Sequence, residues 1–157
     1  MTMSKSELIS QTEKYLSNKN LNISQKDITK PWGAYWYISP ESTNDFLKSY
    51  FPDFQSKELP ISPKILLVEP KKRLSLQLHH RRSEEWHVIQ GPVKVVAGEK
   101  ELILDTNQSV TLKVGENHRL CGLDQAGIVA EIWIHTDSNN PSDEADIVRL
   151  EDDFSRQ

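Results

Sequence analysis

The chain has 157 residues, a mass of 18.1 kDa and a formal net charge of −4, which is the size of one domain. The acidic balance argues against a general nucleic-acid binder, because no broad excess of positive charge exists to displace the counterions of a phosphate backbone. No apolar run is long enough to cross a bilayer and the polar N-terminus lacks a signal peptide, so we expect a cytoplasmic protein without membrane partners. The single cysteine, Cys121, excludes an internal disulfide framework.

The N-terminal third predicts one helix followed by an entry strand. Ser4 and Glu7 have the spacing of a capping box, so we place a helix over residues 4–17, packed over the body or against a second subunit. Residues 18–26 are polar and predict a loop. Residues 30–37 are rich in aromatic side chains and predict a strand whose rings cover the edge of the fold, with ligand contact as the alternative.

Residues 40–62 predict an insertion with one hydrophobic side. Within it, residues 43–50 predict a short helix that carries Phe46 and is ended by Pro52. The apolar side needs a partner, and the sequence leaves open whether it forms a lid over a site or a contact with a second copy. A homodimer is compatible with both the N-terminal helix and this apolar insertion.

Residues 64–135 predict a run of short strands. Turn residues such as Pro70, Gly98 and Gly115 separate them, and helices are confined to the margins. This density of short strands is typical of a jelly roll or a related antiparallel barrel. We therefore predict an all-β fold in one domain over residues 1–157, with a barrel core at 64–135 and a C-terminal segment at 146–156. The predicted strands are 64–69, 74–79, 85–89, 93–97, 101–104, 109–112, 118–121 and 128–134.

The stretch from residue 74 to residue 91 carries three candidate metal ligands. Apolar and polar residues alternate in its first half, so Gln77 and His79 share one face of a strand, and a polar turn then leads to Glu84. A later turn delivers His118 to the start of another strand. Two imidazoles and two side-chain oxygens suit a borderline divalent cation and leave positions for water or substrate. We expect zinc first, and manganese, iron, cobalt or nickel are compatible.

These two stretches resemble the two sequence motifs of the cupin superfamily. Gln77, His79, Glu84 and Gly91 stand at the spacing of the first motif, with Gln77 where many cupins carry a histidine. In the second stretch, Gly115 and His118 match the second motif. The resemblance implies a cupin jelly-roll barrel with Gln77, His79, Glu84 and His118 as the metal ligands.

Strand phase separates the ligands from their neighbours. His80 has the opposite phase to His79 and is predicted to face outward. Glu85 competes with Glu84 for the ligand position, and the motif spacing selects Glu84. Cys121 lies an odd number of residues from His118, so we predict a buried thiol that points away from the metal.

Within the cupins, residues 74–86 are similar to the isomerase domain of type II mannose-6-phosphate isomerases, which is often fused to a mannose-1-phosphate guanylyltransferase. Residues 30–33 and 146–154 match the ends of that domain, and the similarity covers most of residues 29–156. Three departures from the family pattern are Glu85, in place of a histidine before Trp86, Arg81, in place of a frequent third histidine, and Ser155, in place of the glycine before the final arginine.

This resemblance implies a metal-dependent isomerase that interconverts mannose 6-phosphate and fructose 6-phosphate in mannose or polysaccharide precursor metabolism. It places Arg82, Arg149 and Glu151 at positions tied to activity, and Lys64 at a lysine of the family pattern. We assign proton transfer to Lys64 or Glu151, and phosphate binding to Arg82 and Arg149.

Two other functions stay open. One is a non-catalytic cupin that binds a sugar or regulates a partner and keeps the metal as an anchor. The other is a different cupin reaction, such as that of a metal-dependent dioxygenase. The oxygen ligand Gln77 and the basic residues around the metal strand make the dioxygenase less attractive than an isomerase.

Overall fold

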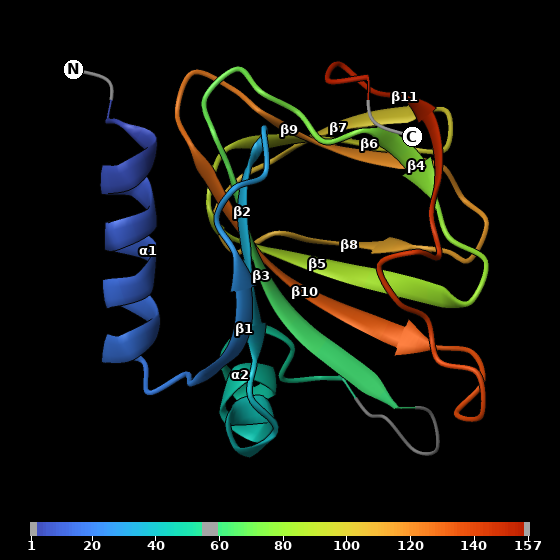
Figure 1. The fold of residues 1–157 in the computed structure, drawn as a ribbon, viewed down its shortest axis with the longest axis horizontal. Coiled ribbons are helices and arrows are strands. Elements are labelled where there is room, and N and C mark those ends of the chain that lie inside the picture. The colour runs from blue at the N-terminus through green and yellow to red at the C-terminus, as the bar shows by residue number, and fades with distance from the viewer. Residues whose placement is uncertain (1–2, 55–59, 156–157) are drawn as a thin grey trace.

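Two antiparallel β-sheets face each other in the computed structural model, which describes residues 3–54 and 60–155 (Figure 1). This arrangement confirms the predicted all-β jelly-roll class. The first sheet contains, in order across it, β1 (Ile23–Asp27), β2 (Gly33–Ile38), β3 (Ile61–Val68), β10 (Gly127–His135), β5 (Arg82–Gln90) and β8 (Ser109–Leu112). The second contains β11 (Val148–Glu151), β4 (Leu76–Leu78), β9 (His118–Gly122), β6 (Val93–Ala97) and β7 (Lys100–Leu104).

The central strands of the six-stranded sheet are largely buried on both faces. β3 illustrates the cause, because its run Ile65-Leu66-Leu67-Val68 is apolar at every position. Leu66 and Val68 join the core between the two sheets, whereas Ile65 and Leu67 join a second core on the outer face. The same alternation points Lys64 toward the inside, with consequences for the site described below.

Helix α1 (Lys5–Asn18) covers part of the outer face and runs alongside the sheet in Figure 1. Ser4 Oγ accepts the backbone N–H of Glu7 and the Glu7 carboxylate accepts that of Ser4, so the predicted capping box is present. Leu8 and Leu16 are buried against the outer core. The predicted helix over residues 4–17 is confirmed to within one residue at each end.

The helical part of the insertion, residues 40–54, packs on the outer face of the sheet. A single turn of 3-10 helix, η1 (Pro40–Ser42), leads into α2 (Thr43–Tyr50), which matches the predicted short helix. Phe46 is fully buried, and Tyr50 and Phe51 are nearly so, in the same core as Trp36. The apolar side of these described residues is therefore used within the chain. Residues 55–59 of the predicted insertion lie outside the described residues, as does residue 156 of the C-terminal segment.

Some element boundaries differ from the prediction. The predicted loop at residues 18–26 contains β1, whose polar central residues are exposed at the sheet edge and so show no apolar alternation. β4 keeps only Leu76–Leu78 of the strand predicted at residues 74–79, and β3 begins at Ile61, three residues before the predicted start. The other predicted barrel strands agree to within three residues at either end.

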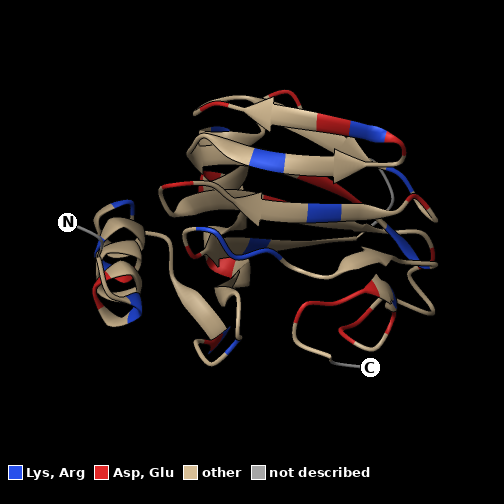
Figure 2. Ribbon diagram, turned by 90° about the horizontal axis from the view of Figure 1, so that it is seen from above, with Lys and Arg blue, Asp and Glu red and all other residues tan. Residues whose placement is uncertain are grey.

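Among the described residues, the helices are too short and too polar to cross a membrane. Lys and Arg are interspersed with Asp and Glu over the strands and loops seen in Figure 2, as expected for a chain with a formal net charge of only −4.

Replacing Phe46 with alanine tests the position of the insertion. Because this ring is fully buried in the outer core, Phe46→Ala should lower the free energy of unfolding by about 3–5 kcal/mol. Lys48→Ala, two residues away on the exposed face of the same helix, should change the free energy of unfolding by less than about 0.5 kcal/mol. Urea denaturation of the two variants measures both values. Equal, small losses would mean that the helix does not pack on the sheet.

Candidate metal centre and its cavity

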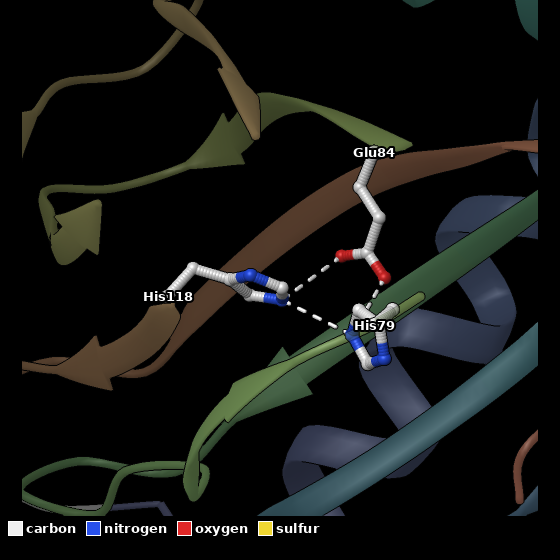
Figure 3. A group of neighbouring side chains, drawn as sticks. All are labelled: His79, Glu84 and His118. Carbon is white, nitrogen blue, oxygen red and sulfur yellow. Dashed lines mark hydrogen bonds and ion pairs between the residues drawn. The ribbon is translucent and has the colours of Figure 1, made fainter. Parts of the chain in front are cut away.

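His79, Glu84 and His118 meet between the two sheets, where their side chains point toward one another (Figure 3). His79 directly follows β4, Glu84 lies in β5 and His118 begins β9. All three side chains are at most 2% exposed. The turn that delivers His118 contains Gly115, whose backbone φ of +75° favours glycine, and the Gly115 N–H bonds His79 O at 2.9 Å. The two sequence motifs are therefore joined at the backbone.

The spacing of the donor atoms suits one small cation. His79 Nε2 lies 3.2 Å from His118 Nε2 and 3.2 Å from Glu84 Oε2, and His118 Nε2 lies 3.5 Å from Glu84 Oε1. Ligands at about 2.1 Å from a tetrahedral zinc ion are separated from one another by about 3.4 Å. The observed separations agree with that geometry.

The protonation of the two imidazoles leaves their metal-facing nitrogens without hydrogen. His79 Nδ1 bonds the carbonyl of Asp146 at 2.6 Å, and His118 Nδ1 bonds the carbonyl of Glu116 at 3.1 Å. A carbonyl only accepts, so each Nδ1 carries the proton and each Nε2 of a neutral ring presents a lone pair. Glu84 Oε1, also buried, has no hydrogen-bond partner. Facing lone pairs and a buried carboxylate oxygen fit a divalent metal, and these residues are the ones that would hold it.

Burial and neighbouring charges set the protonation states of His118 and Glu84. Burial lowers the pKa of His118, while the charge of Glu84 opposes that shift. Burial opposes ionisation of Glu84, but the neighbouring His118, His79 and Arg82 outweigh it and hold the pKa of the carboxyl well below its ordinary value. The site therefore presents a carboxylate and a neutral imidazole near neutral pH, which are the forms that bind metals.

Arg82 lies against the ligands rather than free in the cavity. Its Nε donates to Glu84 Oε2 at 2.8 Å, its Nη2 donates to His79 Nε2 at 3.1 Å, and its Nη1 donates to Ser142 Oγ at 2.9 Å. The guanidinium also stacks 3.6 Å from the centre of the Trp133 ring. These contacts differ from the predicted phosphate contact, because most of the N–H donors of Arg82 are bound to protein groups.

Glu84 also lines a narrow cavity beside the cluster, with a volume of about 50 Å³. Trp32 and Tyr35 of the aromatic entry segment line it, so ligand contact is open to both, whereas Trp36 is buried in the outer core. Positive side chains are prominent in its wall. Besides Trp32 and Tyr35, the lining includes Lys30, Lys64, Gln77, Arg82, Glu84, Glu131, Glu144 and Arg149.

Lys64 reaches the cavity from β3. Its side chain is only 6% exposed, and its ammonium group donates to Glu144 Oε1 at 2.8 Å and lies 3.9 Å from the centre of the Tyr35 ring. Burial opposes ionisation of Glu144, but the charge and hydrogen bond of Lys64 outweigh it and lower the pKa of that carboxyl. The structure thus places Lys64 in the cavity wall, with a carboxylate partner that the sequence did not indicate, and its role in proton transfer stays a prediction.

Arg149 and Glu151 are separated by a β-bulge. Arg149 pairs with Gln77 and lines the cavity, and its buried Nε has no hydrogen-bond partner. Glu151 pairs with Leu76, one residue further along the partner strand instead of two. The shift reverses the strand phase, so Glu151 is exposed and lies outside the cavity lining. We correct the predicted role accordingly and assign Glu151 no part in proton transfer.

Gln77 lies opposite His118 on neighbouring strands and lines the cavity. Its Oε1 accepts a hydrogen bond from Ser75 Oγ at 3.0 Å, so its role as a fourth ligand stays a prediction. The structure places Glu84 rather than Glu85 in the cluster. His80 is exposed and Cys121 is buried, as strand phase predicted.

Glu131 is a cavity residue that the sequence reasoning missed. Its two carboxylate oxygens accept the indole N–H groups of Trp86, at 2.6 Å, and Trp133, at 2.7 Å. Burial, and then the charge of Glu84, raises the pKa of Glu131 to about 8. A single acidic residue inside the apolar run of β10 was the available signal, because a buried carboxyl in such a run needs dedicated partners.

The sequence is similar to proteins of polysaccharide and mannose metabolism. Residues 54–152 match the family described as mannose-6-phosphate isomerase C-terminal. The chain is 34% identical over 131 residues to the xanthan biosynthesis protein XanB of Xanthomonas campestris pv. campestris, covering 83% of this chain and 24% of that one. It is 33% identical over 130 residues to the alginate biosynthesis protein AlgA of Pseudomonas aeruginosa, covering 83% and 23%. The chain therefore spans about a quarter of the length of these curated relatives.

Solved structures show a similar fold at low sequence identity. KdgF from Halomonas sp. matches with a TM-score of 0.52 and 11% identity, covering 73% of this chain and 89% of that one. The capsular polysaccharide assembling protein CapF from Staphylococcus aureus matches with a TM-score of 0.53 and 17% identity, covering 83% and 34%. Together with the family match, these likenesses establish the cupin fold.

Removing one imidazole tests the metal centre. His79→Ala and His118→Ala should each lose stoichiometric metal, because two remaining protein ligands hold a divalent ion weakly. His80→Ala, which changes an exposed ring next to the site, should keep it. Elemental analysis after loading with Zn²⁺ and desalting measures the ratio of metal to protein. Equal metal content in all three variants would contradict the site.

Glu131 should give stability a distinctive dependence on pH. Its pKa is about 8 in the folded chain and about 4.3 when unfolded, so the folded state binds the proton more tightly. Stability should therefore fall as pH rises from about 4.3 to 8, by up to about 1.4 kcal/mol per pH unit. Glu131→Gln should remove that contribution. Urea denaturation between about pH 5 and 8, with a chelator present, compares the two slopes, and parallel curves would contradict the assignment.

Proposed function

The chain belongs to the family of mannose-6-phosphate isomerase C-terminal domains, and we propose that it is a metal-dependent isomerase that interconverts mannose 6-phosphate and fructose 6-phosphate. One observation carries this proposal: Glu84 of the three-residue metal cluster lines a cavity whose wall also carries the cationic side chains of Lys30, Lys64, Arg82 and Arg149, which suit a phosphate. The names of the relatives, xanthan and alginate biosynthesis proteins, support a role in supplying polysaccharide precursors.

The reaction moves a proton between two adjacent carbons of the sugar and needs negative charge to be stabilised on the neighbouring oxygens. A divalent metal held by His79, Glu84 and His118, with Gln77 as the proposed fourth ligand, would supply a Lewis acid for those oxygens. The walls of the sandwich exclude bulk water from the cluster, since its three side chains are at most 2% exposed.

Arg149 is the proposed contact for the phosphate group. Its buried Nε has no partner within the chain, and a guanidinium in that state is well suited to charge-assisted hydrogen bonds with a phosphate oxygen. The bulge in β11 supports this assignment, because it turns Arg149 inward while Glu151 stays outside. Lys30, at the same cavity wall, adds a second positive charge.

Two groups in the cavity are candidates for moving the proton. Lys64 is the one that the sequence predicted, and its ion pair with Glu144 fixes the ammonium group in the cavity wall. Glu131 is the other, because a carboxyl with a pKa of about 8 can accept and return a proton near neutral pH. The indole bonds from Trp86 and Trp133 hold that carboxyl in one orientation.

Two of the departures from the family pattern, Glu85 and Arg81, lie outside the cavity lining. Glu85 has the opposite phase to Glu84 in β5 and borders a surface depression with Tyr50 and Phe51 of the insertion. Arg81 bonds Asn140 Oδ1 at 2.8 Å near the surface. Neither replacement brings a different charge to the lining residues, so both are compatible with the proposed reaction.

A coupled assay for fructose 6-phosphate formed from mannose 6-phosphate tests the function directly. Arg149→Gln should lower kcat/KM by about ten- to a hundredfold, mainly by raising KM, because it removes a charged hydrogen bond to a group remote from the reacting carbons. Glu151→Gln, two residues away and facing outward, should leave kcat/KM and KM unchanged.

The same assay separates the isomerase from the binding module. Turnover that requires metal and disappears in His79→Ala would support the proposal. Saturable binding of mannose 6-phosphate by metal-loaded protein, without turnover on any hexose phosphate tried, would replace it with the sugar-binding or regulatory cupin.

A further inference from the structure

The Nε2 lone pair of His79, one of the candidate metal ligands, already faces the guanidinium of Arg82. His79 Nδ1 is engaged by the Asp146 carbonyl, so His79 has a single remaining acceptor, Nε2. Arg82 Nη2 donates to that atom at 3.1 Å, and Arg82 Nε donates to Glu84 Oε2 at 2.8 Å. A metal bound through His79 needs the same lone pair. Arg82 and the metal therefore compete for His79, and they share the carboxylate of Glu84.

The charges of the cluster explain this contact. Without a metal, the negative carboxylate of Glu84 and the positive guanidinium of Arg82 cancel, and both side chains are at most 5% exposed. A buried carboxylate that lacked such a partner would be costly. A divalent cation adds two positive charges next to the guanidinium, and repulsion between them is strong where water is scarce. Binding of the metal should drive Arg82 off its two contacts.

The released donors belong to the cavity wall. Arg82 lines the cavity together with Lys64 and Arg149, and its Nη1 would still be anchored by Ser142 Oγ. The loaded cavity carries an excess of positive charge and additional free N–H groups, which an anionic ligand can neutralise and bond.

We propose that Arg82 is the built-in counter-ion of the metal ligands, and that its displacement by the metal makes the cavity competent to bind an anion such as a sugar phosphate. This inference rests on the proposed metal centre. It requires the metal to bind before the anion, because Arg82 is bonded to Glu84 and His79 in the metal-free cavity. Thermodynamic linkage then requires the anion to tighten metal binding by the same factor.

The affinity of metal-free protein for Zn²⁺, measured by competition with a chromophoric chelator, tests the competition. Arg82→Gln removes the competing charge and should bind Zn²⁺ at least about tenfold more tightly than the wild type. Arg73→Gln, the matched control, removes an exposed guanidinium that bonds Asp153 away from the cluster and should leave the affinity unchanged. Equal or weaker binding by Arg82→Gln would overturn the proposal.

A measurement on the wild type covers the case in which Arg82→Gln fails to fold. The buried Nε–H of Arg82 should give a distinct ¹⁵N NMR signal in metal-free protein, identified by its loss in Arg82→Lys. One equivalent of Zn²⁺ should move that signal, since the bond to Glu84 Oε2 is broken. An unchanged signal at full metal occupancy would overturn the displacement.

Inorganic phosphate then serves as the anion probe in calorimetry with and without Zn²⁺. Zn²⁺ should tighten phosphate binding in the wild type and in Arg73→Gln, and the enhancement should be about tenfold smaller in Arg82→Gln. An enhancement of equal size in all three proteins would overturn the role of Arg82 while leaving the metal centre intact. Absence of Zn²⁺ binding in every protein would instead overturn the proposed metal centre, and this inference with it.

Discussion

The hydrogen bond from His79 Nδ1 to the carbonyl of Asp146 fixes what the rest of the site can be. It sets the tautomer of the ring and so directs a lone pair toward Glu84 and His118. The carboxylate of Asp146 accepts the backbone N–H groups of His80 and Arg81, both at 3.0 Å, and the hydroxyl of Ser142. Although burial opposes ionisation, these bonds outweigh it and lower the pKa of Asp146 to about 2. One residue of the C-terminal loop thus anchors the turn between two metal ligands, which is why residues 67 positions apart in the chain act as a unit.

The parts of the site that local sequence rules control were predictable. Alternation in residues 74–79 put His79 inside and His80 outside, and the turn at Gly115 placed His118 at the first position of β9. The parts that depend on pairing between distant segments were not. The bulge between Arg149 and Glu151 depends on the register with β4, and nothing within the tail itself indicates that the phase reverses there.

An edge strand and a buried acidic residue were also not predictable from the sequence. β1 was read as a loop because its polar central residues face solvent, and its strand conformation comes from pairing with β2. Glu131 stands in an apolar run where Trp133, two residues away, reaches one of its oxygens, and only the fold brings Trp86 to the other. In both cases, tertiary contacts supply what the local pattern lacks.

The insertion and the metal centre are connected through the sheet that lies between them. β3 and β10 present apolar side chains on both faces, so a bare outer face would leave Ile65, Leu67 and Ile132 in water. Phe46 of α2 and Leu16 of α1 cover that face. With the outer face covered by apolar packing, the inner face of the same strands can carry Lys64 and Glu131 against the cavity. Burial of hydrophobic surface on one side of the sheet therefore stabilises the strands that hold charged groups on the other, where each charge needs its own partner.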